Sequence, residues 1–149
     1  MDQLKETVSL ATGSAFIGPI IALVLLTVLV WFWLYIVRLG FMRSNKIDPE
    51  SLKTAKGKMQ MDGPQNYPAE NYNHLFEMPI LFYVVCLLFV ATGKGDMEAL
   101  NLAWAFVATR VLHSIIHCTY NKIMHRFMVF LVSSIVMMLL VYKAWALLL

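Results

Sequence analysis

The feature that most constrains this chain is a run of 23 residues without a charged side chain, residues 15–37. At 1.5 Å per residue, a helix of this length exceeds the roughly 30 Å thickness of a bilayer's hydrocarbon core. Trp31, Trp33 and Tyr35 mark the far end of the run as a membrane interface, and Arg38 follows at once. The run therefore predicts a first transmembrane helix.

Three further apolar runs follow, and the composition supports the same interpretation for each. The chain is 60% hydrophobic and only 14% charged, whereas soluble domains are roughly 45–50% apolar. We therefore expect an all-α membrane protein, a four-transmembrane-helix bundle that forms one domain over residues 1–149. The predicted spans are residues 15–37, 72–92, 100–118 and 127–148.

The polar segment 38–71 is predicted to be a loop between the first two spans. Asp48-Pro49-Glu50 offers a helix N-cap, a proline at N1 and an acid in the first turn, which predicts a short helix through Lys56. A second helix is predicted from about Pro68 to Thr92, kinked at Pro79 because proline lacks a backbone donor.

Counting lysine and arginine gives the expected orientation. The first loop holds six basic residues and the third loop two, whereas the opposite side holds Lys5, Lys94 and Lys143. By the positive-inside rule, both termini lie outside the cytoplasm and the loop 38–71 lies inside. Because the basic residues flank membrane spans, lipid head groups account for the net charge of +3, and we expect no nucleic-acid partner.

Two stripes of polar side chains interrupt these apolar helices. Glu70, Asn73, His74 and Glu77 fall at i, i+3, i+4 and i+7, which is one face of a helix. A carboxylate inside a membrane helix costs about 2.5–3.5 kcal/mol on insertion scales, so it needs a polar environment and a partner. The first stripe therefore indicates a binding site or an ion pair.

The second stripe repeats this spacing with Arg110, His113, Ser114 and His117. Arg110 lies roughly 13 Å from the cytoplasmic end of its span, where lipid offers a guanidinium no partner. Glu77 is its natural counter-ion. Two interpretations stay open, a structural ion pair that fixes helix register and a cationic clamp for an anionic ligand.

The remaining polar residues include histidines, cysteines and an arginine, which are residue types that bind metals or take part in thiol chemistry. The i, i+4 pair of His113 and His117 could hold a metal or haem, but with four histidines and no HExxH sequence we favour hydrogen bonding instead. Cys86 and Cys118 are expected to be buried thiols without a disulfide. Arg126 has two interpretations, head-group anchoring and lowering the pKa of a nearby thiol.

Residues 71–82 (Asn-Tyr-Asn-His-Leu-Phe-Glu-Met-Pro-Ile-Leu-Phe) and 110–117 (Arg-Val-Leu-His-Ser-Ile-Ile-His), with Tyr120 and Arg126, resemble the MAPEG family of membrane-associated proteins in eicosanoid and glutathione metabolism. The similarity is greatest to the bacterial members, which implies a bacterial inner membrane. It also implies a left-handed four-helix bundle assembled as a homotrimer. Glutathione would lie between subunits near the cytoplasmic face, with an apolar small-molecule substrate in the groove toward the membrane lipids.

The resemblance implies a glutathione-dependent transferase or peroxidase acting on apolar electrophiles. The alternative is a non-catalytic lipid-binding or interaction protein of the same fold. By position, Arg126 matches the thiol-activating arginine, and no metal is implied. The implied ligand-binding residues are Asn73, His74, Glu77, Arg110, His113, His117 and Tyr120.

The chain departs from the family pattern in two ways, and in one of them Glu77 stands for the family glutamate but is displaced by one position relative to Pro79. The arginine expected four residues before Asn73 falls at Ala69, so a main contact to glutathione carboxylates is missing. Lys56, Lys58 or Arg43 are the basic residues available to replace it. This departure favours the non-catalytic alternative, whereas the double polar stripe, richer than one ion pair requires, favours the enzyme.

Overall fold

A computed structural model describes residues 13–148, so Lys5 and Leu149 lie outside the described residues. Four helical segments are long and apolar enough to cross a membrane: Gly13–Ser44, Pro64–Thr92, Met97–Cys118 and Ile123–Leu148. The described part contains no strand. The expected all-α membrane class with four transmembrane helices is thereby confirmed, whereas the homotrimer remains a prediction.

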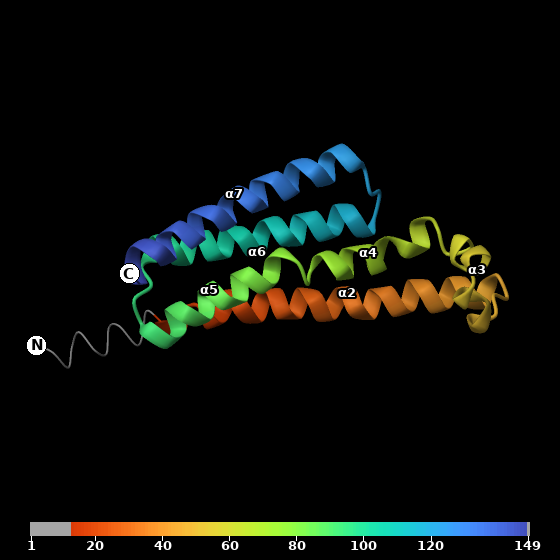
Figure 1. Cartoon of the computed structure of the whole chain (residues 1–149), viewed down its shortest axis with the longest axis horizontal. Helices are drawn as coiled ribbons and strands as arrows, with labels where there is room; N and C mark the ends of the chain where they lie inside the picture. Colours follow the sequence, from red (N-terminus) through yellow and green to blue (C-terminus); the bar gives the residue numbers. More distant parts are fainter. Residues whose placement is uncertain (1–12, 149) are drawn as a thin grey trace, which may run out of the picture.

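The helices run back and forth along one long axis (Figure 1). The elements are α2 (Ile17–Ser44), α4 (Tyr67–His74), α5 (Met78–Thr92), α6 (Met97–Cys118) and α7 (Ile123–Leu148). In Figure 1, α2 lies along the segment formed by α4 and α5. α6 lies between these helices and α7. The start of α2 and the end of α7 lie at the same end of the bundle, as an even number of crossings requires.

The core is apolar and lies where α2, α5, α6 and α7 meet. Phe82 stacks on Phe106 with ring centroids 4.9 Å apart, and Phe16 stacks on Phe89 at 4.7 Å. Away from these contacts, α2 exposes many large apolar side chains, including Leu29. An apolar outer surface is unfavourable in water but is compatible with lipid, which is the expected surroundings of α2.

The second membrane segment is broken rather than kinked. α4 ends at His74 and α5 begins at Met78, so Glu77 is the N-cap of α5 and Pro79 occupies its first turn. Proline is tolerated there because the first backbone N–H groups of a helix have no intrahelical acceptor. The prediction of one continuous helix from Pro68 was therefore wrong between residues 75 and 77.

The segment predicted as the loop 38–71 is largely helical. α2 continues to Ser44, and the predicted short helix is divided into η1 (Pro49–Lys53) and α3 (Ala55–Met59). Thr54 separates the two because its side chain accepts a hydrogen bond from the Gly57 N–H and so caps α3. A third short helix, η2 (Pro64–Asn66), leads directly into α4.

At the opposite end, a tight turn joins α5 to α6. Gly93 ends α5 in the left-handed conformation, with φ 65°. Asp96 then caps α6, because its carboxylate accepts a hydrogen bond from the Ala99 N–H at 2.7 Å. Lys143 of α7 pairs with both Asp96 and Glu98. This lysine, counted above only as a positive charge, therefore ties α7 to the start of α6.

Asp96 gives the fold an expected dependence on pH. Its hydrogen bond from Ala99 and its pairing with Lys143 lower the pKa of this carboxyl below its ordinary value of 3.8. A depressed folded-state pKa contributes stability that is complete above 3.8 and is lost as pH falls through the folded value. We expect the melting temperature of the wild type in detergent to drop more steeply across this acidic window than that of Asp96→Asn.

The Asp96→Asn variant is a matched control because asparagine keeps the N-cap geometry and loses only the titrating charge. Parallel melting curves for the two proteins through the acidic window would show that Asp96 contributes no pH-dependent stability.

Candidate functional site

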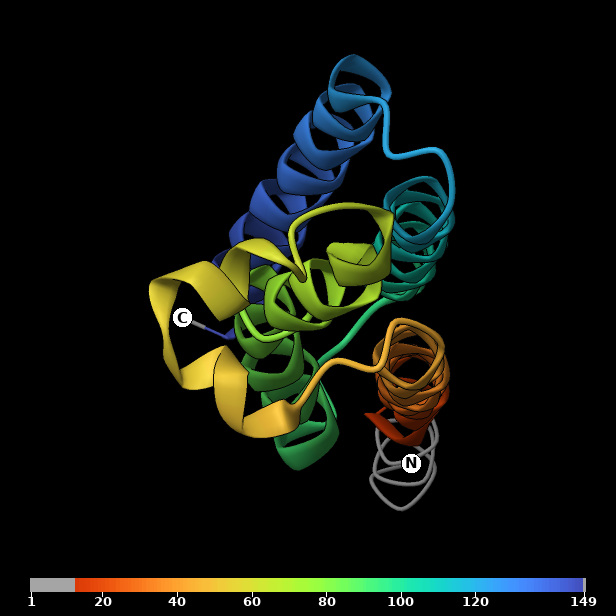
Figure 2. The ribbon, with the colours of Figure 1, turned by 90° about the vertical axis from the view of Figure 1, so that its right-hand side faces the viewer.

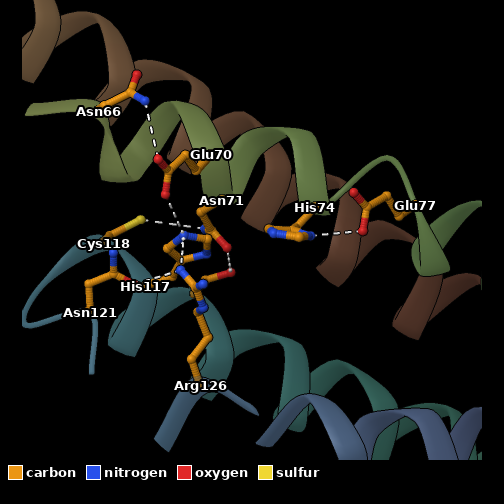
Figure 3. Close-up of polar contacts among 10 residues, drawn as sticks. Asn66, Glu70, Asn71, His74, Glu77, His117, Cys118, Asn121 and Arg126 are labelled. Atoms are coloured by element: carbon orange, nitrogen blue, oxygen red, sulfur yellow. Dashed lines mark hydrogen bonds and ion pairs between the residues drawn. The ribbon is translucent and has the colours of Figure 1, made fainter. Parts of the chain in front are cut away.

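The two polar stripes face each other where α4 packs against α6 (Figure 3). Asn71 of α4 is completely buried there. Its Oδ1 accepts a hydrogen bond from Ser114 at 3.3 Å, and its Nδ2 donates to the Cys118 sulfur at 3.4 Å. A buried amide with both ends bonded fixes the relative position of the two helices, since any shift would leave a polar group unpaired.

Glu70, His117 and Arg126 form a chain of polar contacts at one end of this interface (Figure 3). The Glu70 carboxylate accepts from Asn66 at 3.2 Å through Oε1 and lies 3.3 Å from His117 Nε2 through Oε2. The same Nε2 is 2.8 Å from Arg126 Nη1, which also donates to Asn121 Oδ1 at 2.8 Å. This chain joins α4, α6 and α7.

The two contacts of His117 Nε2 require different protonation states of this nitrogen. Arginine only donates, so Nε2 must accept from Arg126, which leaves the ring proton on Nδ1. A carboxylate only accepts, so the contact with Glu70 needs that proton on Nε2 instead. Nδ1 of His117 is buried and has no hydrogen-bond partner in the part of the chain that the structure describes. A ligand that draws Arg126 away would therefore allow His117 to donate fully to Glu70.

Three histidine rings gather around this chain. His74 lies 6.1 Å from His113 and 5.4 Å from His117 by ring centroids, and His113 lies 5.6 Å from His117. His74 Nδ1 is turned toward the Glu77 carboxylate at 2.8 Å. Both ring nitrogens of His113 are buried without a partner. We call His74, His113, His117 and the adjacent Arg110 the histidine–arginine cluster.

Arg110 is the charged member of the cluster and is only 1% exposed. Its one hydrogen bond within residues 13–148 runs from Nη2 to the His74 carbonyl at 3.4 Å, and Nε and Nη1 find no partner among these residues. Its guanidinium lies 5.9 Å from the centre of the Phe130 ring. The expected ion pair with Glu77 is not formed, because the break before α5 turns that carboxylate to His74.

The structure brings together most of the predicted site residues. Asn73 is exposed and its side chain makes no hydrogen bond to the described residues. Tyr120 is also exposed, and its hydroxyl lies 3.2 Å from His125 Nδ1, outside the cluster. The residues that meet are His74, Glu77, Arg110, His113, His117 and Arg126.

Sequence reasoning missed two residues of this site. Asn71 lies two positions before Asn73, on the side of α4 that packs against α6. Its spacing of i, i+3 from His74 was the available signal. Asn121 sits in the turn before α7 with φ 46°, a conformation that asparagine tolerates, and nothing in the sequence connects it to Arg126.

The charge of this site favours the binding of an anion. Among residues 13–148, no group of three or more His, Cys, Asp and Glu side chains is placed to hold a metal ion. A buried guanidinium without a counter-ion is costly, and a bound carboxylate or thiolate would supply one. Lys56, Lys58 and Arg43 make no hydrogen bond or ion pair with the cluster.

Comparison with known proteins gives one match. The family model of the MAPEG family matches residues 16–146, which include all four membrane helices except a few terminal residues of the first and last, and every residue of the cluster. No curated protein and no solved structure matches the chain. Because the match extends over nearly the whole sequence, the chain belongs to the MAPEG family.

Proposed function

We propose that this membrane protein binds glutathione and joins it through its sulfur to apolar electrophiles, or uses glutathione to reduce lipid peroxides. The observation that carries the proposal is Arg110, a buried guanidinium with two nitrogens that find no hydrogen-bond partner among the described residues and no carboxylate in ion-pair contact. The chain belongs to a family that includes glutathione transferases and peroxidases, and this membership suggests glutathione as the ligand. Both carboxylates of glutathione are anions that such a group binds through charge-assisted hydrogen bonds.

Arg126 is the residue proposed to act on the thiol. All of its side-chain hydrogen bonds within the described residues are made by Nη1, so the Nε and Nη2 hydrogens remain for a ligand. A guanidinium beside a thiol favours the thiolate, which is the nucleophilic form. The thiol proton leaves to water, the sulfur forms a bond to the electrophilic carbon, and the leaving group departs with the bonding electrons.

A non-catalytic lipid-binding role is the second candidate, and one observation favours it. Ala69 stands where the resemblance places an arginine for glutathione carboxylates, and α4 contains no lysine or arginine. In that case Arg110, Asn71 and His117 would only fix how the helices pack.

Mixing the detergent-solubilised protein with glutathione in a stopped-flow spectrophotometer separates the two candidates. We expect ultraviolet absorbance of a thiolate to develop and the melting temperature to rise. S-methylglutathione is the matched control, since it keeps both carboxylates but has no thiol, and it should raise the melting temperature without an absorbance change. Stabilisation by glutathione without thiolate would refute the transferase, and no response at all would favour the non-catalytic role.

The assembly and orientation are proposed on the same family grounds and on the loop charges. A homotrimer in a bacterial inner membrane, with both termini outside the cytoplasm, would place the basic segment between α2 and α4 inside. Native mass spectrometry tests the trimer. Labelling of a Lys53→Cys variant by an impermeant reagent in whole cells tests the orientation. We expect no labelling, and labelling would show that this segment lies outside the cell.

A further inference from the structure

The buried side-chain nitrogens and oxygens that have no hydrogen-bond partner within residues 13–148 all belong to four residues of α6 and α7. These six atoms are Nε and Nη1 of Arg110, both ring nitrogens of His113, Nδ1 of His117 and Oγ of Ser133. Ser133, on α7, is not among the site residues described above. α6, which carries the other three, lies next to both α4 and α7 (Figure 2). Because buried polar groups are almost always paired, this group of atoms indicates a site for a ligand.

Ser133 lies at the level of Arg110 in the bundle. α6 and α7 are antiparallel, and Phe130 of α7 lies opposite both His113 and Arg110 (Figure 1). Its ring centroid is 6.2 Å from that of His113 and 5.9 Å from the guanidinium carbon of Arg110. Ser133 follows Phe130 by nearly one helical turn, and Arg110 precedes His113 by the same interval. The unpaired hydroxyl and the unpaired guanidinium nitrogens are therefore at one level between the two helices.

The Ser133 hydroxyl does not make the bond that a serine in a membrane helix commonly makes with its own backbone. Its neighbour Ser134 donates from Oγ to the Phe130 carbonyl at 2.9 Å, and Thr27 donates in the same way to the Leu23 carbonyl. Ser133 is 1% exposed and has no such bond. Its hydroxyl is therefore available to a partner inside the bundle.

The unpaired atoms are mostly donors. Nε and Nη1 of Arg110 can only donate, neutral His113 donates through one ring nitrogen, and the Ser133 hydroxyl can donate as well. A water molecule among them would also need acceptors for its own two hydrogens, and few are present. An anion only accepts hydrogen bonds and also balances the guanidinium charge. The donor set therefore favours an anion over water.

No carboxylate of the described residues is in ion-pair contact with Arg110. Glu77 pairs with His74, and Glu70 with His117, and the side chains of both acids are 55% and 44% exposed. The unpaired atoms of Arg110, by contrast, are closed to solvent. A monatomic anion is the class of ligand that such a closed site admits with the least rearrangement.

We infer that a chloride ion binds between α6 and α7, held by Arg110, Ser133 and His113. It would supply the counter-ion of the guanidinium whenever no glutathione carboxylate reaches Arg110. The chloride site shares Arg110 with the glutathione site proposed above, but chloride binding does not depend on glutathione. Because the two anions use one guanidinium, they compete, and chloride concentration sets the apparent affinity for glutathione.

Melting temperatures of the detergent-solubilised full chain, with gluconate replaced by chloride at constant ionic strength, test the inference. We call the protein in gluconate, without chloride or glutathione, unliganded. The melting temperature of the wild type should rise with chloride and then saturate. Ser133→Ala should need about tenfold more chloride for half of the rise, the typical effect of losing one hydrogen bond to a charged group. Ser134→Ala is the matched control and should respond like the wild type, because its hydroxyl bonds within α7.

Two further measurements locate the ion. Arg110→Met should abolish the chloride response, and a crystal of the wild type grown in bromide should show an anomalous peak between Arg110 and Ser133. No chloride response in the wild type, equal responses of Ser133→Ala and Ser134→Ala, or bromide only at other positions would each overturn the inference. A chloride response without any response to glutathione would support the inference and refute the proposed function.

Discussion

Replacing Arg110 with methionine is expected to abolish the stabilisation of the protein by glutathione while leaving the unliganded protein as stable as the wild type, or more so. The guanidinium is 1% exposed and has one hydrogen bond of 3.4 Å, so the unliganded protein gains little from it. Removing a buried charge that has no ion-pair contact relieves a desolvation penalty of several kcal/mol, whereas a single long hydrogen bond contributes about 1 kcal/mol. Melting temperatures with and without glutathione measure both effects.

Glu77→Gln is the matched control for this experiment. The Glu77 side chain is 55% exposed and pairs with His74, so its loss should cost less than about 1 kcal/mol. The response to glutathione should persist. A large loss of stability in Arg110→Met would instead assign the guanidinium a structural role, and an undiminished glutathione response in that variant would end its role as a clamp.

Replacing Arg126 with glutamine is expected to lower kcat/KM for glutathione conjugation by about 10²–10³-fold, the loss typical of removing one group that stabilises a developing negative charge. The thiolate absorbance on mixing with glutathione should fall by a similar factor at neutral pH. Arg126→Lys should recover part of both, because lysine restores the charge but not the planar fork that also reaches Asn121.

Lys122→Gln controls for the loss of positive charge at this end of the bundle, because Lys122 is exposed in the same turn and has no contact with His117. It should keep the wild-type thiolate signal. If Arg126→Gln retained that signal while losing only stability, its contacts with His117 and Asn121 would be the whole of its role.

The four membrane helices were predictable because each depends only on a local property of the sequence. A charge-free run such as 15–37 can satisfy its backbone hydrogen bonds in lipid only as a helix, and the N-cap at Asp48 marked a helix start by its sequence. The divided second span was not predicted correctly. Pro79 signals that a helix is disturbed, but a kink and a complete break differ by the backbone angles of residues 75–77, which packing against α6 decides.

The candidate site was predictable one helix at a time, but its pairings were not. The spacing of Arg110, His113 and His117 placed them on one face, as the structure has them. Glu77 was expected opposite Arg110 because counting i, i+7 from Glu70 assumes a continuous helix. The break removes that register, so the carboxylate that reaches α6 is Glu70 and it meets His117.

The break after His74 also gives Arg110 a partner that no side chain supplies. The carbonyl group of His74, the last residue of α4, accepts only a 3.4 Å backbone hydrogen bond from the Glu77 N–H, and a helix end carries a partial negative charge of up to about half an electron. Arg110 points at that end through the His74 carbonyl. An incoming anion must therefore compete with the backbone for the same guanidinium. Such competition would lower the affinity of the site for an anionic substrate and for its product by similar amounts. Weaker binding of the product would speed its release and so favour turnover.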